Sequence, residues 1–482
     1  MDSKFHIQEA TILGIQKAFS KNLIQSEELV YQYLERIAKY DHGGIKLNSV
    51  LELNADVIHI AKALDYERKN KGIRSNLHGI PILVKDNINT ADKMHTSAGS
   101  YALKDSYARR DAFLVEKLRQ AGAVILGKAN MTEWANYMSD HMPAGYSSRG
   151  GQVLNPYGIN SLSPGGSSAG SGVSVTSNLC CASIGTETSG SIIDPASILG
   201  IVGIKPTIGL VSRRGIIPVS YMQDTAGPMT RTVEDAAIIL GAIVGFDEED
   251  PITILSQSNG YSDYTRFLDK DSMKGIRIGI PRDYFFDDLS EEEITIVESA
   301  VKIIKQLGAE VVDNISIPQS KELSSKTAEL YEFKNSINFY LSNLDSHIPV
   351  HSLSDLISFN KTHEDIMLKY GQAYFETVEK TTGTLTEEKY VSLRLKELHQ
   401  SKEKIDAALK EHNLDALLFP GDKATPMVNK AGYPMITVPA GTLKDGSSMG
   451  ITFNAEAFSE PKLIKLAYSF EQHANKRIPP DL

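Results

Sequence analysis

The chain has 482 residues, of which 41% are hydrophobic and 23% are charged, an ordinary composition for a soluble protein with a large core. Its net charge of −10 and the lack of a block of basic residues argue against nucleic acid or an anionic membrane as a main partner. Its longest apolar run, residues 236–245, is far shorter than a membrane span. Cys180 and Cys181 are its only cysteines, too few for a disulfide framework or a thiolate zinc site. Residues 1–19 show no signal-peptide pattern, and together these two features predict a cytoplasmic protein.

The spacing of apolar residues predicts the first elements of the chain. Helices are predicted over residues 12–19, 27–37, 57–71 and 111–120. Strands are predicted over residues 49–53, 80–84 and 124–126. Ser26, which precedes Glu27 and Glu28, is the expected N-cap of the second helix. This alternation predicts an α/β fold, with a central mixed β-sheet flanked on both faces by α-helices.

The later part of the chain continues the same alternation after a turn-rich segment, residues 139–172. Strands are predicted from the short apolar runs at residues 199–204, 211, 216–219, 274–280, 415–419, 435–438 and 449–453. Helices are predicted after Thr232, after the capping box of Ser290 and Glu293, and over residues 462–472. Residues from about 320 to 412 are charged, rich in tyrosine and mostly helical, and are predicted to form a peripheral insertion.

Residues 163–197 are the most unusual stretch of the sequence. About half of the first thirty are serine or glycine, yet apolar residues are interleaved among them, which a flexible Gly/Ser linker lacks. Small residues together with an apolar run predict a backbone packed tightly inside the protein. Serine also becomes a nucleophile when a base lies beside it. We therefore expect this stretch to carry the active site.

Two short motifs do not fit their usual structural context. Gly166 to Gly170 matches a nucleophile elbow centred on Ser168, but a turn precedes it instead of a strand, and no downstream histidine has a suitable context. Gly122 to Lys128 resembles the start of a phosphate-binding loop, but Ala129 stands where a hydroxyl is needed. The histidines show no metal-ligand spacing, so no metal site is predicted.

A serine nucleophile without a histidine needs another base, and lysine can serve when burial lowers its pKa towards neutrality. Lys85 stands directly after the apolar run at residues 80–84, which is of the buried-strand type. It is the lysine best placed for this role.

The motifs around these residues resemble those of the amidase signature family. They are VKDN around Lys85, PGGSS around Ser167 and ETSGS around Ser191, joined by GKANMTEWAN at 127–136 and YPMITVPAG at 433–441. The resemblance implies one amidase-signature domain over residues 1–482. Its core motifs span about 77–232 and 414–475, and the insertion lies at about 320–412.

The resemblance also implies a Ser–Ser–Lys triad. Neutral Lys85 takes a proton from Ser167, which follows a cis peptide bond from Gly166 and in turn deprotonates Ser191. Ser191 then attacks an amide carbonyl and forms an acyl-enzyme that water cleaves. The backbone N–H groups of Thr188, Ser189, Gly190 and Ser191 form the oxyanion hole. Neither a metal nor an organic cofactor is implied.

Some positions depart from the pattern of many family members. Ser189 replaces a glycine, and Ile193 and Asp194 replace an arginine–apolar pair, which separates the chain from the A subunit of tRNA-dependent amidotransferases. Residues 205–229 are most similar to the bacterial peptide amidase branch, which hydrolyses C-terminal amides of peptides and amino-acid amides. The expected substrate is therefore a small-molecule or peptide amide. The A subunit of such an amidotransferase remains as one alternative, and a non-catalytic binding member of the family remains as another.

Three further features have expected roles. Asp224 is expected to brace a turn through backbone hydrogen bonds, and Trp134 is expected in the core. Residues 137–151 are expected to line the pocket because of their position in a loop.

Overall fold

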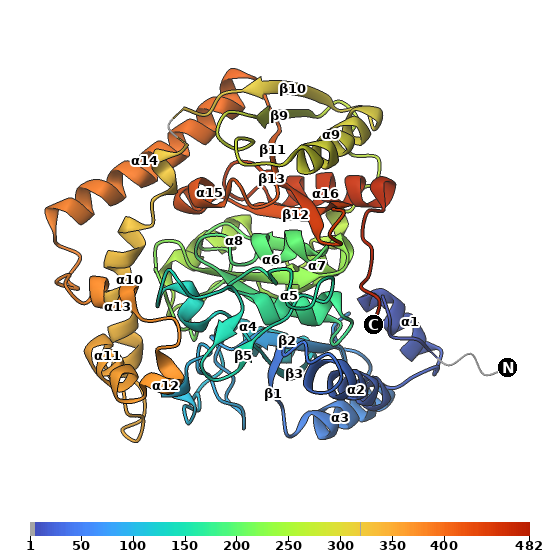
Figure 1. The fold of residues 1–482 in the computed structure, drawn as a ribbon. Coiled ribbons are helices and arrows are strands. Elements are labelled where there is room, and N and C mark those ends of the chain that lie inside the picture. The colour runs from blue at the N-terminus through green and yellow to red at the C-terminus, as the bar shows by residue number, and fades with distance from the viewer. Residues whose placement is uncertain (1–4, 319) are drawn as a thin grey trace.

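A mixed β-sheet runs through the whole molecule (Figure 1). The structure is a computed structural model that describes residues 5–318 and 320–482. Within these residues the main sheet has 11 strands in the order β1-β3-β2-β6-β8-β7-β12-β13-β11-β9-β10. They are β1 (Val50–Leu53), β2 (Pro81–Lys85), β3 (Val124–Ala129), β6 (Ala182–Glu187), β7 (Val202–Lys205), β8 (Thr225–Thr230), β9 (Arg277–Pro281), β10 (Glu310–Ile315), β11 (Ala416–Pro420), β12 (Met435–Thr442) and β13 (Ser448–Asn454). Strands β4 (Tyr146–Ser147) and β5 (Gly151–Gln152) form a separate hairpin.

Parallel pairing in one half of the sheet determines where the site lies. Strand β2 pairs in parallel with β3 on one side and with β6 on the other. The carboxyl ends of β2 and β6 therefore meet at the same edge of the sheet, the edge at which open α/β sheets bind ligands. Lys85 is the last residue of β2, and the turn that carries Ser191 follows β6.

Helices flank both faces of the sheet, which confirms the predicted fold class. Helices α5 (Ala169–Thr176) and α6 (Ile193–Ile198) contact each other, and both pack on strands. Another group of helices packs together. Its members are α4 (Phe113–Gln120), α7 (Val233–Ile243), α9 (Glu291–Gln306) and α16 (Glu460–Ala474). Helix α7 contacts α4 and α16, and α16 also contacts α9. The remaining helices of the first half are α1 (Ile12–Ser20), α2 (Ser26–Arg36), α3 (Val57–Lys71) and α8 (Ser256–Asn259).

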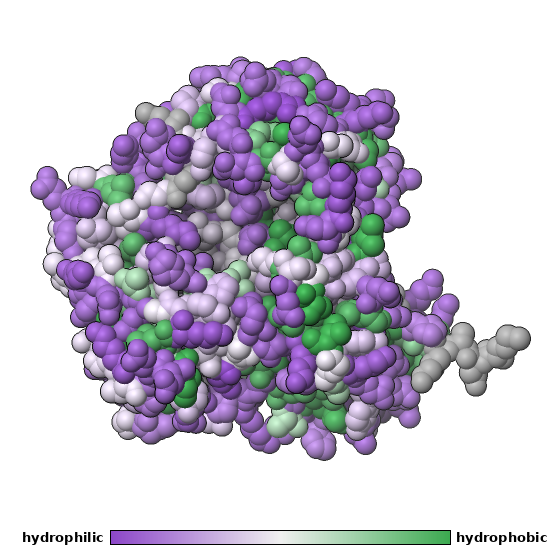
Figure 2. Space-filling model, viewed as in Figure 1, coloured by the Kyte–Doolittle hydropathy of each residue, from purple (hydrophilic) through white to green (hydrophobic). Residues whose placement is uncertain are grey.

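The helices of residues 327 to 431 lie to one side of the sheet (Figure 1). They are α10 (Thr327–Ser342), α11 (Leu353–Thr362), α12 (Glu364–Met367), α13 (Ala373–Val378), α14 (Glu388–Glu411) and α15 (Thr425–Ala431). A buried apolar cluster joins Phe333 and Ile337 of α10 to Trp134 and Met138. The surface is hollowed between the part that carries α10 and α14 and the rest of the molecule (Figure 2). No helix among the described residues is long and apolar enough to cross a membrane.

The Ser/Gly-rich stretch is packed inside the protein, as its mixed composition predicts. All eight residues of α5 are buried. A Cβ atom at Gly170 would lie 2.3 Å from the carbonyl oxygen of Asn130 and 2.4 Å from that of Ser49. Only glycine allows the backbone of α5 to approach its neighbours this closely.

Two sequence predictions were wrong in detail. Helix α2 begins at Ser26 itself, and Gln25 occupies the cap, where its N–H donates to Glu28 at 2.9 Å. The Ser26 hydroxyl instead donates to the Gly79 carbonyl. Residues 199–201 are not part of β7, because the backbone of Leu199 closes α6.

The apolar residues 211 and 216–219 also form no strand. Ile216 makes one isolated bridge to Ile88, and Val211 makes one to Ile208. The Ile217 N–H donates to the Asn87 carbonyl, so this loop covers the segment that follows Lys85.

Candidate active site

Lys85 points its amino group into a polar pocket at the end of β2. Its Nζ atom lies 2.7 Å from Ser167 Oγ. The same nitrogen donates to the carbonyl oxygen of Thr186 at 3.2 Å and to its hydroxyl oxygen at 2.9 Å. The Asn87 amide donates to the Thr186 hydroxyl as well, at 3.0 Å. Three oxygen atoms, one from Ser167 and two from Thr186, therefore fix the direction of the lysine nitrogen.

The environment of Lys85 favours its neutral form. The side chain is fully buried, and burial lowers the pKa of Lys85 from 10.5 to about 7. The carboxylates of Glu187 and Asp224 act in the opposite direction and raise the pKa. Desolvation prevails because neither carboxylate forms an ion pair with the lysine. A neutral amine at this position can accept the Ser167 proton.

Ser167 lies between the lysine and the turn that follows β6. Its side chain is 1% exposed, and the Gly166–Ser167 peptide bond is cis, as the family resemblance implies. The next residue is tied to the Ser191 turn, because the Ser168 N–H donates to the Ser191 carbonyl at 3.2 Å. The Ser168 hydroxyl donates to the Thr186 carbonyl.

Ser191 stands at the tip of the turn between β6 and α6 and is 8% exposed. The Glu187 carboxylate accepts the N–H groups of Ile192 and Ile193 at 2.7 and 2.9 Å. Its other oxygen accepts the Asn429 amide from α15 at 2.8 Å. Glu187 therefore holds the two ends of the turn at a fixed separation.

The backbone N–H groups of this turn are free to bind an anion. Among the described residues, no protein atom accepts a hydrogen bond from the backbone N–H of Thr188, Ser189, Gly190 or Ser191. Gly190 has a φ of 100°, in the left-handed region that glycine adopts without strain. Consecutive free donors in a turn are an anion-binding arrangement.

A cavity of about 130 Å³ brings the two serines together. It is lined by Ala135, Asn136, Tyr137, Gly166, Ser167, Ser189, Gly190, Ser191, Asp194, Lys326 and Asp422. Three of the four residues expected in the oxyanion hole thus reach the cavity, whereas Thr188 does not line it. Of the expected pocket segment 137–151, only Tyr137 lines this cavity, and the rest of the segment includes β4 and the first residue of β5.

Asp194 and Asp422 add two carboxyl groups to the cavity that no sequence motif had indicated as part of the site. Asp194 Oδ2 accepts the Gly166 N–H at 2.8 Å and so ties α6 to the Ser167 turn. Burial, and then the nearby Asp422 carboxyl, raise the pKa of Asp194 to about 8. Burial raises the pKa of Asp422 as well. Burial and the proximity of the two carboxyl groups both disfavour a double negative charge on the pair.

The cavity wall also contains a strained segment. Trp134, Ala135 and Asn136 have φ values of 49°, 54° and 69°, in the left-handed region that L-residues rarely occupy. The Trp134 side chain is buried in the apolar cluster with α10, which confirms its predicted place in the core. Packing of Trp134 holds Ala135 and Asn136 at the cavity. Strain of this kind clusters at functional sites.

Asp224 braces a turn, as the sequence predicts. One carboxylate oxygen accepts the N–H groups of Val219 and Ser220 at 2.7 and 2.9 Å. The other accepts the Thr188 hydroxyl at 2.6 Å. Burial raises the pKa of Asp224 to about 6.

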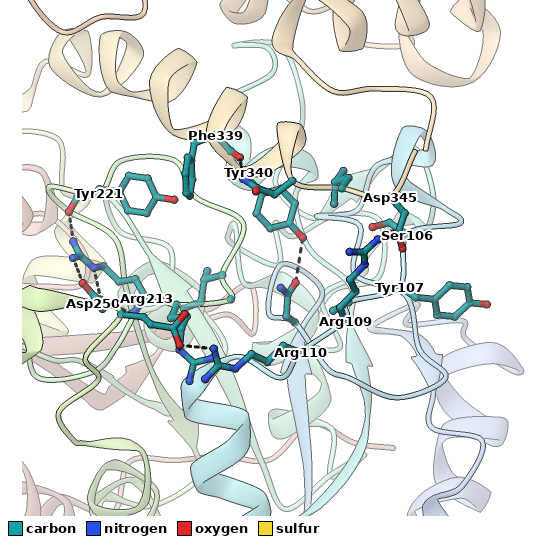
Figure 3. Close-up of a pocket in the computed structure, with 18 of the residues that line it drawn as sticks. Ser106, Tyr107, Arg109, Arg110, Arg213, Tyr221, Asp250, Phe339, Tyr340 and Asp345 are labelled. Carbon is teal, nitrogen blue, oxygen red and sulfur yellow. Dashed lines mark hydrogen bonds and ion pairs between the residues drawn. The ribbon is translucent and has the colours of Figure 1, made fainter. Parts of the chain in front are cut away.

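A larger cavity lies elsewhere and contains none of the expected catalytic residues. It has a volume of about 590 Å³, and aromatic side chains such as Tyr221 and Tyr340 form its walls (Figure 3). Its arginines are paired with acidic residues, for example Arg213 with Asp250 and Arg109 with Asp345. In the described part of the chain, no group of three or more histidine, cysteine, aspartate or glutamate residues is placed to hold a metal ion.

Comparisons with known proteins show the family to which the chain belongs. The family model named Amidase matches residues 28–427. A probable amidase of Arabidopsis thaliana is 42% identical over 491 residues, covering 100% of this chain and 93% of the relative. The crystal structure of native peptide amidase from Stenotrophomonas maltophilia has a TM-score of 0.93 at 42% identity, covering 98% of both chains. The glutamyl-tRNA(Gln) amidotransferase A subunit of Thermoanaerobacter pseudethanolicus is 31% identical, covering 97% of this chain and 96% of the relative. The chain therefore belongs to the amidase signature family and is an amidase, a hydrolase of carbon–nitrogen amide bonds.

Proposed function

We propose that this amidase hydrolyses primary carboxamides, in particular the C-terminal amides of peptides and amino-acid amides, through an acyl-enzyme on Ser191. Similarity to a protein described as a peptide amidase supports the substrate class. The main support for the mechanism is the contact of 2.7 Å between the buried Lys85 and the buried Ser167, because it supplies a base without a histidine.

In the first half of the reaction, Lys85 accepts the Ser167 proton while Ser167 takes the proton of Ser191. The Ser191 oxygen forms a bond to the amide carbon, and the carbonyl oxygen becomes an anion. The proton then returns from Lys85 through Ser167 to the amide nitrogen. The carbon–nitrogen bond breaks, ammonia leaves, and an ester on Ser191 remains.

In the second half, water replaces the amine. Lys85 and Ser167 take a proton from the water as it attacks the ester carbon. The bond to Ser191 breaks, the serine regains its proton from Lys85 through Ser167, and a carboxylic acid leaves that releases its own proton to the solvent. Every proton that Lys85 accepts is returned, so the enzyme ends in its starting state.

The free N–H groups of Ser189, Gly190 and Ser191 supply the charge stabilisation. Donors already aimed at the developing oxyanion need no reorganisation during the reaction, and each can contribute about 3–4 kcal/mol. Thr188 belongs to the same turn but does not line the cavity, so the proposed oxyanion hole rests on the other three of the four expected donors.

The size of the cavity supports a small reacting group. A volume of about 130 Å³ holds a carboxamide and its first neighbours, but not a whole peptide. The rest of a peptide substrate extends away from the serines, so a chain end fits this site better than an internal peptide bond.

The experiment is to measure ammonia release from an N-acylated dipeptide amide by the purified single chain, with the Ser191→Ala variant as a control. We expect the purified wild-type chain to release ammonia without any partner protein, and the Ser191→Ala variant to release none. A requirement for further protein chains, tRNA and ATP would favour the A subunit of an amidotransferase instead. Absence of both turnover and labelling of Ser191 by a sulfonyl fluoride would favour a non-catalytic binding protein.

A further inference from the structure

A buried polar network joins the helices of the insertion to the turn that carries Ser191. Arg394 of α14 and Glu332 of α10 form a two-point ion pair, in which Arg394 Nε donates to Glu332 Oε1 at 2.6 Å and Nη2 donates to Oε2. The Tyr390 hydroxyl donates to Glu332 at 2.8 Å, and the Ser220 hydroxyl donates to the same carboxylate. All four side chains are buried.

Gln223 connects this ion pair to the turn. Arg394 Nη1 donates to Gln223 Oε1 at 2.7 Å. The Gln223 amide nitrogen donates to the Thr188 carbonyl at 3.2 Å and to Glu329 at 3.1 Å. Because arginine can only donate, the amide oxygen of Gln223 must face it, and the amide nitrogen must face Thr188. Arg394 therefore determines which way round the amide of Gln223 lies.

The Thr188 carbonyl belongs to the same planar peptide unit as the Ser189 N–H. In a trans peptide the C=O and N–H bonds point in opposite directions, so a fixed carbonyl fixes the N–H. Gln223 holds this carbonyl on the side of the insertion, and Ser189 lines the cavity with Ser191. Asp224 holds only the side chain of Thr188, so Gln223 is the contact that orients the peptide plane.

We infer that Arg394 and Glu332, acting through Gln223, are positioning residues that aim the Ser189 N–H at the oxyanion. This inference rests on the proposed function of the Ser191 turn. A buried ion pair is by itself weak evidence for stability, and well-packed apolar residues often replace one without loss. The rate of amide hydrolysis is therefore set in part by two helices that contribute no catalytic group.

The test compares Gln223→Met, Arg394→Lys and the double variant with wild type in the hydrolysis of a peptide amide. Gln223→Met is expected to lower kcat by about tenfold to a hundredfold, as for loss of part of an oxyanion donor, with KM changed by less than about threefold. Arg394→Lys cannot present the two-point fork and is expected to lower kcat in the same way. If Arg394 acts through Gln223, the double variant loses no more activity than Gln223→Met alone.

Lys334→Met is the matched control. Lys334 also lies on α10, and its amino group donates to the carbonyls of Glu379 and Thr381 without contacting Gln223. We expect this variant to lose thermal stability while keeping the kcat of the wild type. A purely structural role for the network would instead make kcat follow stability in all the variants.

A second readout uses a peptide aldehyde, which forms a tetrahedral adduct with an oxyanion. Its inhibition constant should rise in proportion to the loss of kcat/KM in Gln223→Met, whereas KM for the neutral amide changes by less than about threefold. An active wild type whose Gln223→Met variant keeps full kcat and aldehyde affinity would overturn the inference and leave the proposed function intact. An inactive wild type would instead overturn the proposed function. If Arg394→Lys does not fold, Glu332→Gln takes its place in the same comparison, because it removes the ion pair with Arg394 and keeps the shape of the side chain.

Discussion

Lys85 Nζ lies 2.7 Å from Ser167 Oγ, and the two atoms come from the end of β2 and from a turn that precedes α5. The lysine is also held by both oxygens of Thr186, so its remaining direction is aimed at the serine. Because burial lowers the pKa of Lys85 to about 7, the amine is suited to act as a base near neutral pH, as the proposed mechanism requires.

The pH dependence of activity should report the titration of Lys85. The base must be deprotonated, so kcat/KM should rise with pH through an apparent pKa of about 7 and then level off. Lys85→Met should lower kcat/KM by about 10²- to 10⁴-fold and remove this acidic limb. Lys128→Met removes another fully buried lysine from the neighbouring strand β3 and should keep the limb. A limb that persists in Lys85→Met would assign the titration to another group.

The same burial of Lys85 should lower the free energy of unfolding at neutral pH. Its pKa is about 7 in the folded state and about 10.4 in the unfolded state. Between these values the unfolded state binds more protons, so the wild-type free energy of unfolding gains from this group as pH rises. Relative to Lys85→Met, the wild type should gain on the order of 4 kcal/mol between pH 7 and pH 10. Urea unfolding of both proteins at the two pH values measures this, and a difference independent of pH would contradict it.

Thr186 should tune the base rather than bind substrate. Thr186→Val preserves the shape of the side chain but removes the oxygen that accepts from Lys85 and Asn87. An acceptor favours the ammonium form, so its loss should move the acidic limb to lower pH and lower kcat by about tenfold. Thr230→Val is the control, because the Thr230 hydroxyl donates to the Thr232 carbonyl away from the site. Equal pH profiles for wild type and Thr186→Val would refute this role.

Asp194 should act as a hydrogen-bond acceptor for the Ser167 turn. Asp194→Asn keeps an oxygen for the Gly166 N–H, whereas Asp194→Ala leaves this N–H without its acceptor. The alanine variant should lose about 1–3 kcal/mol of unfolding free energy and about tenfold in kcat, and the asparagine variant should stay close to wild type. Steady-state kinetics and thermal unfolding compare the two. Equal losses in both variants would show that the carboxyl itself is needed.

The fold and the place of Lys85 at the end of a buried strand could be predicted from local signals in the sequence, whereas Ser167 and Ser191 were indicated by motifs that resemble those of the amidase signature family. The apolar run before Lys85 predicts a buried strand, and the small residues around Ser167 and Ser191 predict close backbone packing. The strand prediction for the apolar residues 216–219 was wrong, because these residues cover the loop after Lys85 and do not enter the sheet. Burial drives both arrangements, so hydrophobicity alone does not separate them.

The residues that support the site could not be inferred in the same way. Asp422 lines the cavity with Ser191, more than two hundred residues away along the chain. Arg394 contacts Gln223 across 171 residues, and Glu332 contacts Ser220 across 112 residues. Gln223 stands next to Asp224 in a recognisable motif, yet its partner Arg394 belongs to a helix whose surface pattern is ordinary. Local sequence patterns show which groups can react, whereas the contacts that aim them depend on the assembled fold.

The most direct measurement is to identify the residue that becomes covalently attached. The protein is treated with a fluorophosphonate at neutral pH, and the modified peptide is located by mass spectrometry in wild type, Ser191→Ala and Ser167→Ala. We predict a single adduct on Ser191 in the wild type, no adduct in Ser191→Ala, and slow labelling of Ser191 in Ser167→Ala. An adduct on Ser167 or Ser168, or amide hydrolysis by Ser191→Ala above about one part in 10⁴ of the wild-type rate, would contradict the assignment of Ser191 as the nucleophile.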